Sequence, residues 1–319
     1  MAGGGTEIKL SWQRGKPMNN IPVIKQTNIP GGKLISRGKV RDIYDAGDYL
    51  LLVTSDRISA YDVVMDEGIP LKGVVLNQIS KFWFDHLQGI IPNHFISDDT
   101  ERFPAPFHRF KPQLLGRSML VRKAKPLPVE CIVRGYLAGS GWREYREKGT
   151  LHGAKIVAGL QQSEKFPEPL FTPSTKAESG HDENISFSRM AEMIGHDLAA
   201  RIRDISLQLY QKAAGFAENR GIIIADTKFE FGLINDDLIL IDEALTPDSS
   251  RFWPKSSYRV GQSQASLDKQ YLRDYLDTLD WDKTPPAPQL PPEIIKNTSQ
   301  KYQEIYRILT GKNISEVLV

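Results

Sequence analysis

The stretch GIIIADTKFEFGLINDDLILIDEALTPDSSRFW, residues 221–253, contains two strand-like segments joined by a short polar turn. An apolar run at 222–225 opens the first segment, and charged and uncharged residues then alternate strictly from Asp226 to Phe231. Side chains along a strand change face at every residue. The apolar run at 238–241 returns as the second strand, so we predict a hairpin. One face of its first strand carries three charged residues, Asp226, Lys228 and Glu230.

The length of the turn decides which other side chains share this charged face. If the turn is the three residues 235–237, Glu230 lies opposite Asp242, whereas a two-residue turn places the two carboxylates on opposite faces. We predict the three-residue turn and a Mg²⁺ site, because one or two carboxylates completed by substrate phosphates usually hold this ion. Lys228 would bind the same phosphates. The alternative is a sheet with a solvated charged face, but the flanking apolar runs favour a site.

The composition is that of a globular protein with one large or two ordinary domains: 319 residues, 40% hydrophobic and 25% charged. A net charge of +2 does not indicate an extended basic surface for binding nucleic acid. The single cysteine, Cys131, excludes an internal disulfide and a cysteine-based zinc site. We see no signal peptide and no apolar run of about 20 residues that would span a membrane. We therefore expect a cytoplasmic protein that binds neither nucleic acid nor membranes. We also expect a monomer rather than a homo-oligomer.

A first candidate phosphate site lies near the N-terminus, where strands are predicted at 33–36, 40–44 and 49–54. Gly38 and Lys39 occupy the turn between the first two strands. A glycine there lets backbone N–H groups approach a phosphate, and Lys39 and Arg41 add positive charge. An ordinary turn is the alternative, and the GxxxxGK[ST] motif of P-loop proteins is absent.

A second candidate phosphate site follows the strands predicted at 118–123 and 129–137. The short segment 124–128 between them is a candidate interdomain hinge, and ligands often bind at domain interfaces. Gly139-Ser140-Gly141 then open a predicted helix. The first N–H groups of a helix are unpaired and its dipole favours negative charge, so Arg134 and Ser140 suit a phosphate. Simple capping of the helix by Ser140 is the alternative.

The rest of the chain supplies a scaffold and one more polar segment. Apolar residues spaced by three or four predict one long helix over 189–217, with Ser188 as its cap. In the polar segment 171–187, Lys176 and Asp182 would suit a zwitterion such as an amino acid, although a solvated loop is the alternative. A Pro-rich linker at 284–292 precedes a final amphipathic helix.

Six motifs occur in an order that resembles the SAICAR synthetase (phosphoribosylaminoimidazole-succinocarboxamide synthase) family, in its longer, yeast-like form. They are GKVRDIY, SDRISAYD, VECIVRGYLAGSGWREY, FTPSTKAESGHDENIS, IADTKFEFG and DEALTPDSSRFW. The resemblance implies an α+β fold, with an N-terminal antiparallel sheet similar to the nucleotide-binding lobe of kinases. We place this lobe at 1–124, a larger α/β lobe at 125–283, and the linker with a C-terminal helix that docks back at 284–319.

The resemblance also implies a reaction and its site. ATP, 5-aminoimidazole-4-carboxylate ribonucleotide (CAIR) and L-aspartate would give SAICAR, ADP and phosphate in purine biosynthesis, with Mg²⁺ as cofactor and an acyl phosphate as the activated carboxylate. The implied ATP-binding residues are Gly38, Lys39, Arg41, Lys123, Glu130 and Lys228. The implied CAIR-binding residues are Arg57, Arg134, Ser140, Asp248 and Arg251. Lys176 and Asp182 would bind aspartate, and Glu230 and Asp242 the metal. The implied catalytic residues are Lys228, Asp248 and Arg251.

Three classes of function remain open from the residues alone. A ligase needs a nucleotide site, a metal site and an amino-acid site. A small-molecule kinase shares the first two and lacks the third, and a non-catalytic nucleotide-binding protein would bind ATP without turnover. The ordered motifs favour the ligase, in which the protein would act mainly by positioning substrates and neutralising charge.

Overall fold

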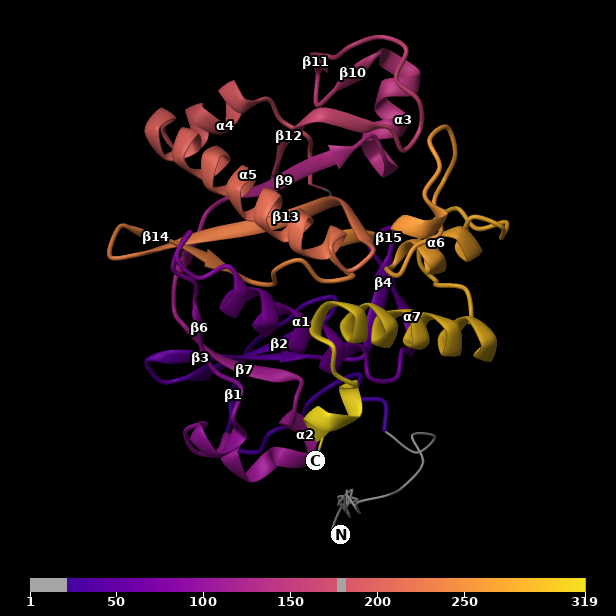
Figure 1. Cartoon of the computed structure of the whole chain (residues 1–319). Coiled ribbons are helices and arrows are strands. Elements are labelled where there is room, and N and C mark those ends of the chain that lie inside the picture. Colours follow the sequence, from indigo (N-terminus) through magenta and orange to yellow (C-terminus); the bar gives the residue numbers. More distant parts are fainter. Residues whose placement is uncertain (1–21, 177–181, 319) are drawn as a thin grey trace.

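Two antiparallel sheets, one above the other in Figure 1, organise the computed structural model, which describes residues 22–176 and 182–318. Residues 1–21, 177–181 and 319 lie outside this part. The lower sheet has the order β1-β2-β3-β7-β6. Its strands are β1 (Lys33–Arg37), β2 (Arg41–Ala46), β3 (Tyr49–Thr54), β7 (Ser118–Arg122) and β6 (Phe95–Ser97). The first three confirm the predicted N-terminal strands.

The upper sheet has the order β12-β9-β13-β14, and β8 and β15 also pair with β13. Its strands are β8 (Lys125–Pro126), β9 (Val129–Tyr136), β12 (Lys165–Thr175), β13 (Ile222–Ile234), β14 (Asp237–Ile241) and β15 (Ser250–Pro254). β13 is therefore the strand around which the others are arranged, and all its pairings are antiparallel. With helices on both sheets, this confirms the predicted α+β fold.

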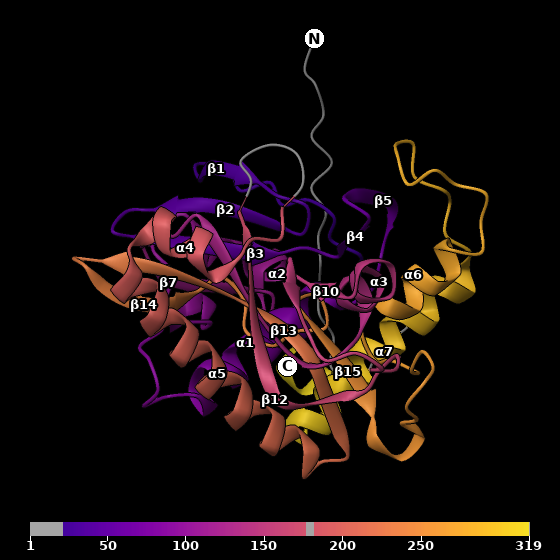
Figure 2. The same ribbon diagram turned by 90° about the horizontal axis from the view of Figure 1, so that it is seen from above.

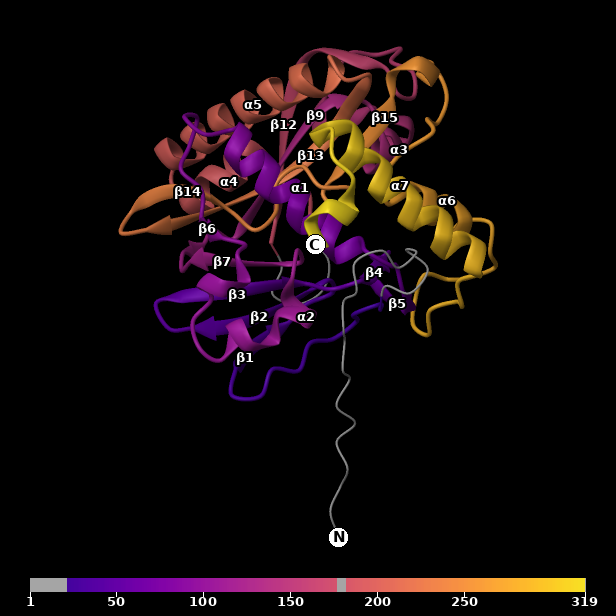
Figure 3. The same cartoon turned by 60° about the horizontal axis from the view of Figure 1, so that its bottom comes forward.

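Two helices lie side by side between the sheets (Figures 1 and 3), α1 (Lys72–His86) and α7 (Pro292–Thr310). The main hydrophobic core joins both sheets through α1: Val74 and Ile79 belong to the same cluster as Val121 of β7 and Phe229 of β13. The C-terminal helix thus packs back onto the body of the molecule. The lobe boundaries that we placed at 124 and 283 stay a prediction.

The long helix predicted over 189–217 is two helices, α4 (Phe187–Ile194) and α5 (His196–Glu218). Gly195, with φ of 89°, separates them. Glycine adopts this positive φ without the steric penalty of a Cβ atom, so the chain turns there although the apolar spacing continues. The cap of α4 is Ser186 rather than Ser188, since its hydroxyl accepts a hydrogen bond from the Arg189 N–H at 3.1 Å. α5 packs against β13, β9 and β12, and Figure 2 shows it beside β12.

The remaining elements are short. They are the hairpin β4 (Arg57–Ala60) and β5 (Val63–Gly68), α2 (Lys111–Leu114), α3 (Gly139–Lys148), the hairpin β10 (Thr150–Leu151) and β11 (Ala154–Lys155), α6 (Gln270–Leu276), and 3₁₀ turns at Thr100–Arg102, Phe107–Phe110, Lys255–Ser257 and Ile314–Leu318. The β4–β5 hairpin was not predicted. Its Ile58 packs with Leu272 and Leu276 of α6, a contact between opposite ends of the chain. Within the described ranges, no helix has the length and apolar character that crossing a membrane needs.

Candidate active site

The turn of the β13–β14 hairpin has two residues, Asn235 and Asp236, and not the three that we predicted. Both have positive φ, 48° and 68°, as in the type I′ turn whose twist matches that of hairpin strands. Glu230 therefore pairs with Ile241. The predicted pairing of Glu230 with Asp242 is wrong.

Asp242 nevertheless lies close to the charged face, because the backbone changes direction at this residue. β14 ends at Ile241, and Asp242 has φ of 63°, so the regular alternation of faces stops before it. Its carboxylate accepts a hydrogen bond from Arg41. Burial opposes ionisation of Asp242, but Arg41, Lys228 and Lys176 outweigh burial and lower its pKa below the usual range. Asp242 thus lies in the electrostatic environment of the lysines that also surround Glu230.

Lys228 lies at the centre of a charge network on this face. Its ammonium group donates to Glu130 of β9 and, over 2.9 Å, to Glu230. Lys176 also donates to Glu230. Burial disfavours the charge on Lys228, but Glu230 and Glu130 outweigh this and raise its pKa. The structure therefore brings together residues predicted for ATP, metal and aspartate.

Burial raises the pKa of the Glu130 carboxyl, although Lys228 acts in the opposite direction. Asp182 adds to this increase through its negative charge, which places the second predicted aspartate-binding residue within the electrostatic range of the network.

A cavity of about 180 Å³ lies beside this network. It is lined by five of the predicted residues, Arg134, Ser140, Lys228, Asp248 and Arg251. Two guanidinium groups converge on one carboxylate oxygen of Asp226, that of the buried Arg134 at 3.3 Å and that of the partly buried Arg251 at 2.6 Å. Two cations thus share one anion at this end of the charged face.

The start of α3 is shaped to admit Arg251. Gly139 has φ of 56°, and a Cβ atom there would lie 2.1 Å from a guanidinium nitrogen of Arg251. The N-cap position belongs to Ala138, and no side chain caps the helix. The capping alternative for Ser140 is therefore wrong; its hydroxyl lies 3.5 Å from Arg134, facing the cavity.

Asp248, predicted to contact CAIR, is held by the protein on both of its oxygens. Lys72 of α1 donates to one oxygen at 2.7 Å and Lys269 lies 3.3 Å from it. The hydroxyl of Tyr302 in α7 donates to the other at 2.7 Å. Burial opposes ionisation, but Lys269 and Lys72 outweigh it and lower the pKa of Asp248. Asp248 lines the cavity and also anchors its loop to two helices.

Other predicted residues lie away from this cavity. Arg57 was predicted to contact CAIR, but its guanidinium donates to the carbonyls of Gly38 at 3.0 Å and Lys39 at 3.2 Å. It also binds Asp42, so it braces the Gly38 turn, and its contact with CAIR remains a prediction. Lys39 pairs with Asp62 and Lys123 with Asp45, both at exposed positions. The contact of Gly38, Lys39 and Lys123 with ATP remains a prediction.

The model of the SAICAR synthetase family matches residues 34–288. The chain belongs to this family. It is therefore an enzyme, a ligase of purine biosynthesis. Phosphoribosylaminoimidazole-succinocarboxamide synthase from Geobacter metallireducens is 60% identical over 291 residues, which are 91% of this chain and 98% of that protein.

Two solved structures resemble this chain to different degrees. SAICAR synthase from Saccharomyces cerevisiae complexed with SAICAR is 47% identical, with a TM-score of 0.83 over 91% of this chain and 99% of that one. A SAICAR synthetase in complex with ADP is 25% identical, with a TM-score of 0.64 over 87% of this chain and 98% of that one. The predicted likeness to the longer, yeast-like form is confirmed.

Several residues of the site were not assigned by sequence reasoning. Asp226 could have been found from the sequence, because Asp226, Lys228 and Glu230 are every second residue of β13 and so share one face. Arg273, which lines the cavity, and Lys72, which holds Asp248, had no such signal. They lie in α1 and α6, which are distant from β13 in the sequence, and only the packing of these helices brings them here.

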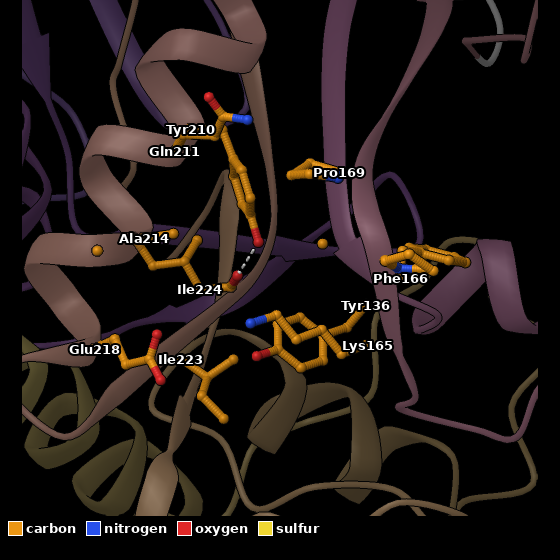
Figure 4. A pocket seen from close by; sticks show the side chains of 13 residues that line it. Tyr136, Lys165, Phe166, Pro169, Tyr210, Gln211, Ala214, Glu218, Ile223 and Ile224 are labelled. Atoms are coloured by element: carbon orange, nitrogen blue, oxygen red, sulfur yellow. Dashed lines mark hydrogen bonds between the residues drawn. The ribbon is translucent and has the colours of Figure 1, made fainter.

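The opposite face of β13 shows how the strand is held in place. Figure 4 shows the pocket there, with the hydroxyl of Tyr210 pointing to the Ile224 carbonyl, to which it donates over 2.7 Å. A Cβ atom on Gly135 would lie 1.9 Å from that hydroxyl oxygen. The absence of a side chain at Gly135 thus lets α5 bind β13 two residues before Asp226.

Proposed function

We propose that the chain joins the carboxylate of CAIR to the amine of L-aspartate and consumes ATP, giving SAICAR, ADP and phosphate. The observation that carries this proposal is the charged face of β13. On it, Asp226 lies in the arginine-lined cavity, while Lys228 and Glu230 belong to the neighbouring network of carboxylates and lysines. A phosphate monoester and a metal-bound polyphosphate would thus bind next to each other. The yeast relative bound to SAICAR and the relative bound to ADP support this.

The phosphate of CAIR would bind Arg134, Arg251 and Ser140. The two guanidinium groups share the carboxylate of Asp226, so this carboxylate alone does not balance both positive charges. Arginine presents paired donors that match phosphate oxygens. The uncapped N–H groups at the start of α3 lie next to Ser140 and favour the same anion.

The nucleotide and its metal would bind at the other end. Glu230 and Asp242 are carboxylates in one cluster of charges, and the described residues contain no group of three or more His, Cys, Asp or Glu side chains placed to hold a metal. This donor set fits Mg²⁺, which usually takes one or two carboxylates and completes its shell with phosphates and water. Mg²⁺, when bound, would neutralise charge on the transferred phosphoryl group. Arg41, now paired with Asp242, would turn to the phosphates, and Gly38, Lys39, Lys123 and Glu130 remain proposed ATP contacts.

The reaction would proceed in two balanced steps. An oxygen of the CAIR carboxylate attacks the γ-phosphorus, the bond to ADP breaks, and an acyl phosphate forms. The aspartate amine then attacks the acyl carbon, the C–O bond breaks, and phosphate leaves with that oxygen while the amine loses a proton. Lys228 lines the cavity and donates to Glu230, so its ammonium would lie where negative charge moves during both steps. Asp248 and Arg251 would orient CAIR, and Lys176 and Asp182 would orient aspartate.

The decisive experiment measures ADP release with CAIR in the presence and absence of L-aspartate. The ligase requires both substrates for sustained turnover. ADP formed at the same rate without aspartate would favour the small-molecule kinase, and ATP binding without any turnover would favour the non-catalytic protein.

The metal assignment is tested by Glu230→Gln and Asp242→Asn. Each variant should fold, as shown by circular dichroism, and should lose at least about 100-fold in turnover, a magnitude typical of a displaced charge-stabilising group. Asp236→Asn in the exposed turn of the same hairpin is the matched control. Full turnover in either site variant would overturn the assignment. A cytoplasmic location and a monomeric state are also part of the proposal, and light scattering of the purified protein tests the latter.

A further inference from the structure

His152 is a buried histidine that neither the sequence motifs nor the proposed reaction assigns. It lies in the turn of the β10–β11 hairpin and is 7% exposed. Its Nδ1 atom lies 3.0 Å from the carbonyl oxygen of Pro173 in β12, and its Nε2 atom lies 3.3 Å from a terminal nitrogen of Arg134. The ring therefore connects the backbone of one strand to an arginine of the cavity.

The two contacts determine which nitrogen carries the proton. A carbonyl oxygen only accepts and a guanidinium only donates, so Nδ1–H must donate to Pro173 while the lone pair of Nε2 accepts from Arg134. The Nε2 contact requires a neutral imidazole, because both ring nitrogens of a protonated histidine are donors. Burial and the charge of Arg134 lower the pKa of His152 to about 4, which keeps the ring neutral at physiological pH.

The position of His152 is itself held from α3. Its φ of 49° is unusual for a residue with a side chain, and Glu144 stabilises the turn by accepting three hydrogen bonds. They come from the His152 N–H at 3.0 Å, the Gly153 N–H at 3.0 Å and the Thr150 hydroxyl at 2.9 Å. Glu144 thus ties the imidazole to the same helix whose first turn carries Ser140.

Arg134 is held along the rest of its guanidinium as well. Its Nε donates to the Thr172 hydroxyl at 3.1 Å and one terminal nitrogen donates to Asp226. The other terminal nitrogen faces both His152 and Ser140. Of these partners, Thr172 belongs to β12, and Asp226 and Ser140 line the cavity. His152, in the turn between β10 and β11, belongs neither to the cavity lining nor to the upper sheet.

We propose that His152 is a positioning residue that holds the guanidinium of Arg134 in the orientation that binds the 5′-phosphate of the ribonucleotide substrate. This inference rests on the proposed phosphate role of Arg134. His152 touches no reacting atom, and its effect passes through Arg134 alone. A change at His152 should therefore weaken binding of the phosphorylated substrate and leave the riboside without the phosphate unaffected.

The test compares two replacements at His152. His152→Leu removes the acceptor, and His152→Gln restores an acceptor oxygen in a neutral side chain. The measurements are kcat and KM for CAIR, and the inhibition constant of the CAIR riboside. We expect the Leu variant to raise KM for CAIR about tenfold, with kcat within about twofold and the riboside constant unchanged. The Gln variant should recover KM to within about threefold. His196→Leu, an exposed change on α5, is the matched control and should alter neither constant.

The outcomes separate this inference from the proposed function. Equal loss for CAIR and riboside, or an unchanged KM in the Leu variant, overturns the role of His152. Arg134→Gln must itself raise KM for CAIR and not the riboside constant; if it does not, the phosphate site is wrong, whatever His152 does. If the Leu variant does not fold, Glu144→Gln decides: a threefold or larger rise in KM for CAIR alone supports positioning through the turn, and no rise overturns it.

Discussion

Tyr302→Phe tests whether the C-terminal helix stabilises the active-site loop through Asp248. The change deletes one hydroxyl group, which donates to a carboxylate oxygen of Asp248 at 2.7 Å. Tyr302 is fully buried, and the Asp248 side chain is 5% exposed. Water cannot replace the lost donor without a rearrangement of the core. Lys72 and Lys269 remain on the other oxygen, so the charge itself stays balanced.

The magnitude follows from these contacts. A buried hydrogen bond to a charged group contributes about 1.5–3 kcal/mol, and we take about 2 kcal/mol for this one. A chain of 319 residues has an unfolding entropy of about 0.7 kcal/mol/K at roughly 2.1 cal/mol/K per residue. The melting temperature should therefore fall by about 3 °C.

The assay is guanidinium unfolding together with scanning calorimetry. Tyr275→Phe on α6 is the matched control, because its hydroxyl makes no hydrogen bond with any residue that the structure describes. That variant should unfold within about 0.5 kcal/mol of the parent, as expected where no partner is lost. Equal stabilities of the Tyr302 and Tyr275 variants would show that the bond to Asp248 contributes nothing, and would refute this reasoning.

Three further predictions concern the sheet and its cavity. Gly135→Ala places a Cβ atom 1.9 Å from the Tyr210 hydroxyl and should lower the free energy of unfolding by about 1–3 kcal/mol through overpacking. Adding Tyr210→Phe, which removes that hydroxyl, should recover part of this loss. If urea unfolding shows no recovery in the double variant, the clash is not the cause. Asp226→Asn leaves two guanidinium groups without their anion and should lower the free energy of unfolding by about 3 kcal/mol. Inorganic phosphate should raise the melting temperature of the variant more than that of the parent. Equal increases in melting temperature would contradict the proposal that these arginines bind an anion. The pKa of His152 is about 4 in the folded protein and about 6.5 in an unfolded chain, so the unfolded state binds more protons between these values and stability falls as the pH drops from about 6.5 to 4. His152→Gln should reduce this loss of stability by about 3 kcal/mol. Urea unfolding of the parent and the variant at pH 7, 5.5 and 4 measures it, and an equal loss of stability in both proteins would contradict the prediction.

The sequence by itself determined the charged face of β13. Alternation along a strand is a property of the local backbone, so Asp226, Lys228 and Glu230 were placed on one face before any partner was known. The order of the motifs likewise identified the family. The spacing of apolar residues located the helical region at 189–217, though not its break at Gly195, because periodicity does not register a residue that tolerates positive φ.

Only the tertiary structure decided where the other charges of the site point. Asp242 lies one residue beyond the end of β14, and its left-handed φ turns it toward Arg41 in spite of a register that sequence reasoning had assigned wrongly. Arg57 and Asp248 looked alike as candidate ligands. The fold surrounds the first with backbone carbonyls and the second with two lysines and a tyrosine.

His152 had no signal in the sequence, because its partners come from separate strands that meet only in the folded chain. A periodic pattern reports which face of its own element a side chain occupies. What lies across from that face depends on segments distant in sequence, and it is settled by packing.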